Sequence, residues 1–163
     1  MAVPTVSRPH PERILGVDPG AAHTGIVVRR GEELLAHHTV DEPDGDHHPA
    51  ALLAALDEIA WHNPPDVIAV ETLVAPHPGN MVRPHNLTVV GIHLGVTIGW
   101  ARCRHPHTPL VLVPPGGNGS GALAAYPGAL RPTRGRGAGY DRLNHCRSAW
   151  DVTRTAELIR RAK

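Results

Sequence analysis

The sequence predicts an α/β fold in which a five-stranded mixed sheet, an antiparallel meander plus parallel strands, is flanked by helices. Short apolar runs bounded by turn residues alternate with longer segments whose apolar residues recur at helical spacing. The expected order is three strands, then helix, strand, helix, strand and helix. Such an alternation packs helices against a sheet that contains parallel strands. The length of 163 residues corresponds to about one domain.

The strands are short apolar runs. They are expected at residues 14–17, 25–28, 32–40, 67–70 and 110–113. Short turns join the first three, the first of them at Asp18-Pro19-Gly20, which predicts an antiparallel meander. The fourth strand follows a helix and delivers Glu71 at its carboxyl end.

Three helices are expected, one that begins with Pro49 in its first turn, one at residues 87–102 and one from about 141 to 163. In the first, apolar residues recur at helical spacing, and Asn63-Pro64-Pro65 ends it. The second is apolar nearly all round, which predicts burial. Gly91, Gly95 and Gly99 lie four apart on one of its faces and would let it approach another element closely.

The organisation is one domain with an N-terminal tail. Residues 1–12 contain three prolines and few apolar residues and are expected to be flexible, while 13–163 form the domain. Within it, residues 114–139 are rich in Gly, Pro and Arg and are expected to form a mobile loop. The chain has no run of about 18 apolar residues and no signal-peptide core, and its two cysteines are too few for a disulfide scaffold. We therefore expect a cytoplasmic protein.

The net charge of +1 is an average over two unlike halves. Residues 32–71 hold ten acidic residues and no Lys or Arg, whereas residues 114–163 hold nine basic residues and three acidic ones. Near-neutrality therefore does not exclude a nucleic-acid partner.

The chemistry is expected to rest on three carboxylates, Asp18, Glu71 and Asp151. The first two end strands, and ligands of α/β sheets gather at the carboxyl ends of strands. Asp151 lies on the last helix, which can pack across the same edge. Taken singly, each acid has a structural alternative, as a turn residue, a strand end or a surface ion pair. Together they predict a site for Mg²⁺ or Mn²⁺, and two such ions can activate water against a phosphodiester.

The segments that carry these acids resemble the RuvC family of Holliday-junction resolvases, in the ribonuclease H-like superfamily. The resemblance lies in Ile14-Leu15-Gly16-Val17-Asp18-Pro19-Gly20 with Thr24-Gly25, in Val67-Ile68-Ala69-Val70-Glu71, and in His145-Cys146-Arg147-Ser148-Ala149-Trp150-Asp151-Val152. It covers roughly residues 13–160. It implies a ribonuclease H-like fold, a bacterial or phage-encoded homodimer, and Mg²⁺-dependent nicking of branched DNA that leaves a 5′-phosphate. It also implies that Asp18, Glu71 and Asp151 bind two metal ions.

Two positions depart from that family. Ser148 stands three residues before Asp151, where the family usually has an acid or a histidine. The metal would then be held by three carboxylates alone, by His145 or through a water. His145 lies six residues before Asp151, which places it on another helix face. Val74 stands where classical members tend to carry an aromatic residue, so the preference for four-way junctions over other branched DNA is left open.

Arginines beside the carboxylates predict contacts with DNA phosphates. The candidates are Arg131, Arg134, Arg136, Arg142 and Arg147. Tyr126 can stack on a base or anchor its own loop. The three tryptophans lie in helical patterns and are expected to pack.

Two alternatives to a nuclease remain. One is a catalytically weak or silent RuvC-like protein that binds DNA, for which Ser148 and Val74 argue. The other is an actin- or sugar-kinase-like ATP-binding domain, because Asp18-x-Gly20 followed by Thr24 also resembles that superfamily's phosphate loop. Those proteins need two such domains, and 163 residues supply one.

Overall fold

The computed structural model describes residues 11–41, 49–73, 83–132 and 141–162. The strands are β1 Arg13–Asp18, β2 His23–Arg30, β3 Glu33–Asp41, β4 Val67–Glu71 and β5 Leu110–Val113. The helices are α1 Ala50–His62, α2 Pro84–Arg104 and α3 Asn144–Arg161, with short 3₁₀ turns η1 Leu123–Ala125 and η2 Gly128–Leu130 before α3.

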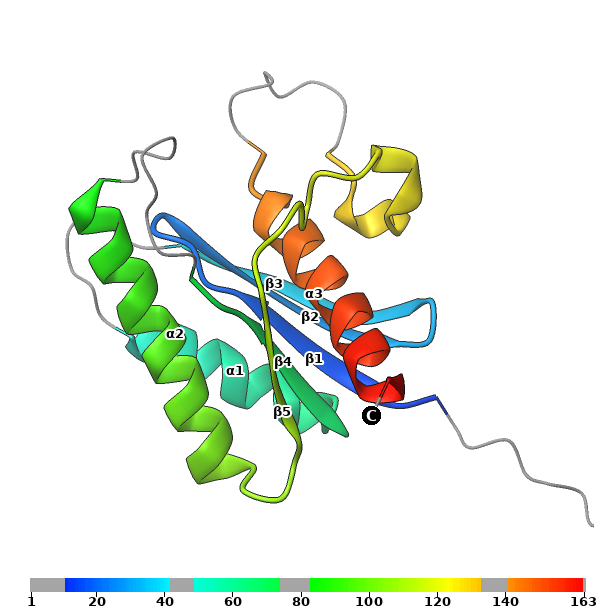
Figure 1. The fold of residues 1–163 in the computed structure, drawn as a ribbon, viewed down its shortest axis with the longest axis horizontal. Coiled ribbons are helices and arrows are strands. Elements are labelled where there is room, and N and C mark those ends of the chain that lie inside the picture. The colour runs from blue at the N-terminus through cyan, green and yellow to red at the C-terminus, as the bar shows by residue number, and fades with distance from the viewer. Residues whose placement is uncertain (1–10, 42–48, 74–82, 133–140, 163) are drawn as a thin grey trace, which may run out of the picture.

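The five strands form one mixed sheet in the order β3-β2-β1-β4-β5 (Figure 1). β1, β2 and β3 pair antiparallel, and β1 pairs parallel with β4, which in turn pairs parallel with β5. This confirms the predicted meander and parallel strands. It also makes β1 and β4 neighbours whose carboxyl ends meet at one edge.

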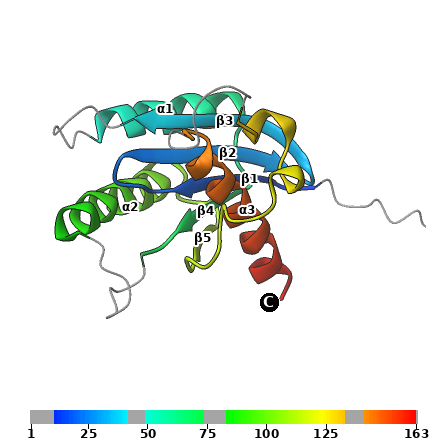
Figure 2. The same ribbon diagram turned by 90° about the horizontal axis from the view of Figure 1, so that it is seen from above.

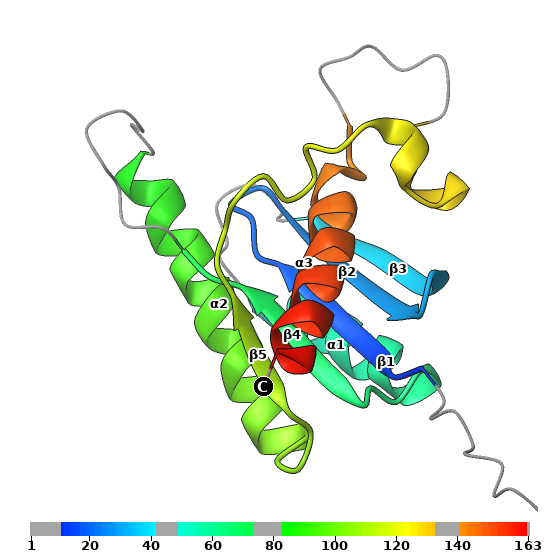
Figure 3. The same cartoon turned by 45° about the vertical axis from the view of Figure 1, so that its right-hand side comes forward.

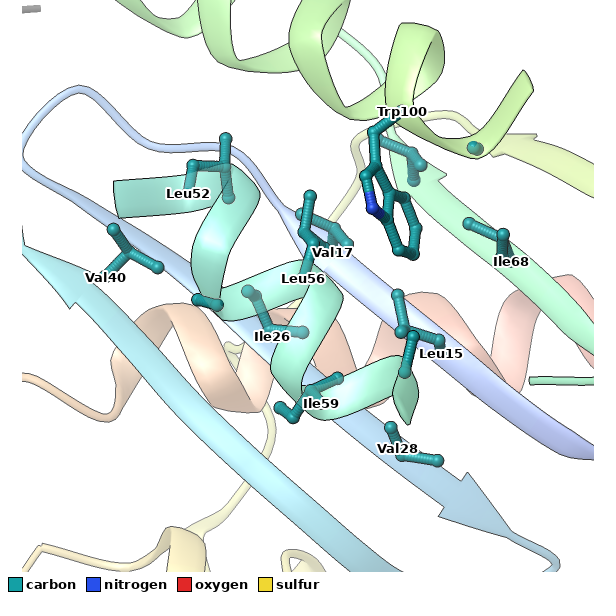
Figure 4. Packing of buried hydrophobic residues seen from close by; sticks show 14 residues of the cluster. Leu15, Val17, Ile26, Val28, Val40, Leu52, Leu56, Ile59, Ile68 and Trp100 are labelled. Carbon is teal, nitrogen blue, oxygen red and sulfur yellow. The ribbon is translucent and has the colours of Figure 1, made fainter. Parts of the chain in front are cut away.

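Helices cover both faces of the sheet, α1 and α2 on one and α3 on the other (Figure 2). Side chains alternate along each strand, so Leu15 and Val17 of β1 join the core under α1 and α2, while Ile14 packs beneath α3. Figure 4 shows the larger cluster, in which Trp100 of α2 meets apolar residues of α1 and the strands.

α3 lies unusually close to the sheet because β1 carries a glycine beneath it. A Cβ built on Gly16 would come within 2.4 Å of Thr153 Cγ2 and 2.5 Å of the Ala149 carbonyl oxygen. One built on Gly25 of β2 would lie 2.2 Å from the backbone of His145. These two glycines let α3 rest directly on β1 and β2, which fixes the height of its N-terminal turns above the strand ends.

Several boundaries differ from the sequence expectation. α2 begins at Pro84, three residues earlier than predicted, because proline suits the first turn of a helix. Much of the predicted mobile loop, residues 114–132, packs on α3 through the buried side chains of Tyr126 and Leu130. Residues 133–139 of that loop and 1–10 of the predicted tail lie outside the described residues.

The tryptophans follow the packing expectation only in part. Trp100 and Trp150 are buried, whereas Trp61 is 79% exposed, so that expectation was wrong for Trp61. It stands near the C-terminal end of α1 on the solvent side. In the described part of the chain, no helix has the length and apolar character needed to cross a membrane.

Candidate active site

Two of the three predicted carboxylates, Asp18 and Glu71, lie side by side at one end of the sheet. They are the last residues of β1 and β4, which run parallel with Val17 opposite Val70. Because side chains alternate along a strand, Asp18 and Glu71, which follow Val17 and Val70, point to the face of the sheet that α3 covers. The two carboxyl groups share a hydrogen bond.

Glu71 is held at both carboxylate oxygens by neutral donors. Ser148 Oγ on α3 donates to Oε2 at 2.9 Å, and Asn118 Nδ2, in the loop after β5, donates to Oε1 at 2.9 Å. Burial raises the pKa of Glu71 to about 7, and the hydrogen bond and charge of Asp18 add to the rise, while the two neutral donors oppose it. The carboxyl pair therefore retains one proton up to about pH 7.

His145 belongs to the same cluster, although the sequence analysis did not assign it. Its Nδ1 lies 2.7 Å from Asp18 Oδ2. Burial lowers the pKa of His145, but the hydrogen bond and charge of Asp18, with the charge of Glu71, raise it above the ordinary value. Helix phase counted from Asp151 places His145 on another face. Counted from Ser148, the three-residue spacing puts His145 on the same helix face, and this signal could have identified it.

Asp151 lies one helical turn beyond Ser148 and faces other partners. Its Oδ2 accepts a hydrogen bond from the Tyr126 hydroxyl at 2.7 Å and another from the Gly119 backbone N–H at 2.9 Å. The residue before Gly119 is Asn118, which contacts Glu71. The structure thus brings Asp18 and Glu71 into direct contact and joins Asp151 to them through one short loop.

The oxygen donors at this edge suit a hard divalent cation. Two adjacent carboxylates repel once both are ionised, and a cation between them removes that repulsion. Among the described residues, no group of three or more His, Cys, Asp or Glu side chains could hold a metal ion by itself. Mg²⁺ does not need such a group, because it keeps several waters and binds through one or two carboxylates plus substrate phosphates. Asp18 and Glu71 therefore fit Mg²⁺ or Mn²⁺.

Arg147 does not contribute to a DNA-binding surface, contrary to the sequence expectation. Its side chain is buried and pairs with Asp141, and Nη1 donates to the Leu130 carbonyl at 3.1 Å. The guanidinium also lies 5.9 Å from the centre of the Tyr126 ring. Arg147 therefore holds the segment before α3 in place. The same contacts show that Tyr126, which is buried, anchors its own loop.

The other predicted arginines are placed differently from one another. Arg131 is exposed and donates to the carbonyls of its own loop. Arg142 has a half-exposed side chain that pairs with Asp41. Arg134 and Arg136 lie outside the described residues, as does Val74.

The chain resembles known proteins in both sequence and fold. No family model matches it. A crossover junction endodeoxyribonuclease RuvC from Hyphomonas neptunium is 35% identical over 81 residues, which cover 45% of this chain and 48% of that protein. The chain thus matches about half the length of this curated relative.

Solved structures of RuvC from Thermus thermophilus share the fold. The structure in complex with a Holliday junction substrate superposes with a TM-score of 0.64 and 19% identity, covering 92% of this chain and 96% of that one. A second structure of Thermus thermophilus RuvC gives a TM-score of 0.59 with the same identity and coverage. With its mixed five-stranded sheet flanked by helices, the chain has the fold of these RuvC structures.

Proposed function

We propose that this chain is a Mg²⁺-dependent, structure-selective DNA endonuclease that cuts Holliday junctions or related branched DNA. The observation that carries the proposal is the contact between Asp18 and Glu71 at the ends of two parallel strands, under a helix that brings His145 and Ser148 to them. The similarity to RuvC proteins supports the choice of substrate class.

In this mechanism Asp18 and Glu71 would hold the divalent cation, and Asp151 would be the third acid of the site. When bound, the cation supplies charge stabilisation for the phosphate and a lowered pKa for the attacking water. His145 keeps the Asp18 carboxylate in place, while Ser148 and Asn118 do the same for Glu71. Water would attack phosphorus in line with the 3′ oxygen, the P–O3′ bond would break, and the cut would leave a 5′-phosphate and a 3′-hydroxyl.

Arginines between residues 131 and 142 would contact the DNA backbone. Arg131 and Arg142 are exposed or half-exposed, and Arg134 and Arg136 belong to the same arginine-rich segment. Contacts of this kind bind phosphates without reading sequence and weaken as salt rises.

Paired cuts require two active sites, and one chain provides one, so the proposal includes a homodimer. On α2, Ile92 is 37% exposed, and a Cβ built on Gly95 or Gly99 meets nothing within 4 Å. Leu73 after β4 and Leu112 of β5 are also exposed, at 39% and 50%. α2 and β5 lie side by side (Figure 3). We call this surface the α2 face. We assign it to a second copy of the chain, because two-fold symmetry places the same apolar surface of each copy against the other.

The direct test compares a four-way junction, a fork and a linear duplex, each with Mg²⁺ and with a chelator. We expect cuts in branched DNA with Mg²⁺, and none in the duplex or with chelator. Junction binding without cleavage of any substrate would contradict the proposal and favour a catalytically silent protein.

A further inference from the structure

A short loop after β5 connects two acids that come from different elements. Asn118 Nδ2 donates to Glu71 Oε1 on β4 at 2.9 Å, and the next backbone N–H, that of Gly119, donates to Asp151 Oδ2 on α3 at 2.9 Å. We call residues 117–119 the clamp. It carries no charge, so it orients the carboxylates without competing for a cation.

The clamp has a defined backbone conformation that is packed against α3. Gly117 and Gly119 have φ angles of +71° and +76°, a region that favours glycine. A Cβ on Gly119 would lie 3.2 Å from the Ser148 backbone nitrogen and 3.3 Å from Ser148 Cβ. The loop therefore rests on the helix at position 148, where a small side chain leaves room for it.

Asn118 and Ser148 donate hydrogen bonds to different oxygens of the same carboxylate. Ser148 Oγ donates to Glu71 Oε2, and the Asn118 amide donates to Oε1. Each oxygen of Glu71 thus has one neutral donor, which fixes the plane of the carboxylate beside Asp18. Neither a serine nor an asparagine was expected to have this role from the carboxylate pattern.

The side chain of Asn118 is not what holds the loop together. The turn is closed by Ser120, whose backbone N–H donates to the Gly117 carbonyl at 3.1 Å and whose hydroxyl contacts the same oxygen. Further on, the Gly121 N–H donates to the Tyr126 hydroxyl at 3.0 Å. The Asn118 amide instead donates to Glu71 on β4, 47 residues away in the sequence.

We propose that Asn118 is a positioning residue for metal binding, which with Ser148 orients Glu71 beside Asp18 and, through Gly119, keeps Asp151 next to them. The inference rests on the proposed function, since it assigns Asn118 to the site that would hold the cation. Residues that orient metal ligands typically change metal affinity or activity about tenfold to hundredfold when lost.

The test measures Mn²⁺ binding to the free protein by calorimetry, and Mg²⁺-dependent junction cleavage, for the wild type, N118A, S148A and the double variant. S120A is the matched control, because it keeps the Ser120 backbone N–H that closes the turn and removes a hydroxyl that bonds to the Gly117 carbonyl and not to a carboxylate of the site. We expect N118A to weaken Mn²⁺ binding roughly tenfold or more and to lower kcat with little change in KM for the junction. S120A should match the wild type.

The outcomes separate the inference from the proposed function. N118A with wild-type Mn²⁺ affinity overturns the inference even if the wild type cleaves DNA. A wild type that binds Mn²⁺ but cuts nothing overturns the proposed function, and the N118A affinity still decides the inference. A wild type that does not bind Mn²⁺ overturns both. If N118A unfolds and S148A does not, the Mn²⁺ affinity of S148A is compared with that of S120A, because Ser148 is the other donor to Glu71.

Discussion

Glu71 is the residue whose ionisation the site alters most. Its pKa is raised from 4.5 to about 7, because the side chain is buried and Asp18 is close to it. Between these two values the folded chain keeps a proton that the unfolded chain has released. The free energy of unfolding should therefore fall as the pH rises through this interval.

E71Q tests this at the level of one residue. In chelator, wild-type stability should decline from pH 5 to pH 8, and E71Q, which has no titrating group at this position, should show a clearly smaller decline. At pH 8, Mg²⁺ should raise the Tm of the wild type but not that of E71Q. Denaturant unfolding across the pH range measures the first effect, and thermal melts measure the second. Identical pH profiles for the two proteins would show that Glu71 is not perturbed as described.

Single residues were predictable from the sequence where strand geometry alone determines them. Asp18 and Glu71 follow buried strands, and parallel neighbours bring such ends together. His145 was not assigned because the helix phase was counted from Asp151 instead of Ser148. Asn118 gave no signal, because its partner is 47 residues away and the loop path depends on two glycines with positive φ.

At the scale of elements, the position of α3 determines the site. This helix brings His145 and Ser148 to the strand ends, and it can do so because Gly16 leaves no side chain beneath it. The sequence predicted the helix but not its distance from the sheet. That distance depends on whether a glycine lies directly under the helix. It therefore depends on how α3 is oriented relative to β1, which is far from it in the sequence.

G16A should lift α3 from the sheet. The added methyl would overlap the Ala149 carbonyl, which is backbone and has little room to move. We expect the free energy of unfolding to fall by about 1–3 kcal/mol, which is the usual cost of overpacking a core. Junction cleavage should fall at temperatures where the variant is still folded. G128A is the control, since a Cβ there meets nothing within 4 Å. Equal stability of G16A and wild type would show that α3 does not pack closely against β1 at Gly16.

On the scale of the whole molecule, the sequence of elements and the mixed sheet were predicted, and the structure adds the order of the strands within that sheet. The order of strands and helices determines the mixed sheet, because a meander followed by crossovers leaves few alternatives. The sequence analysis expected the α2 glycines to allow a close approach. In the structure a Cβ on Gly95 or Gly99 meets nothing within 4 Å, so no element in the described part of the chain approaches α2 closely at these two positions.

I92E should disrupt the proposed homodimer. A charge placed at the centre of the α2 face would be buried against its symmetry mate, and a buried unpaired charge is strongly unfavourable. Analytical ultracentrifugation should show a dimer for the wild type and a monomer for I92E. L158E is the matched control, since Leu158 is 66% exposed on α3, away from the α2 face. A dimer that persists in I92E would place the interface elsewhere.

The central claim is that the carboxylate pair at the ends of β1 and β4 is the catalytic centre of a DNA endonuclease. D18N tests it most directly, because it keeps the shape of the side chain and removes its charge. The measurement is the rate of four-way junction cleavage in Mg²⁺ by D18N and wild type, with junction binding measured in parallel. We expect D18N to bind the junction as tightly as the wild type and to show no cleavage. Cleavage by D18N at the wild-type rate would contradict the account.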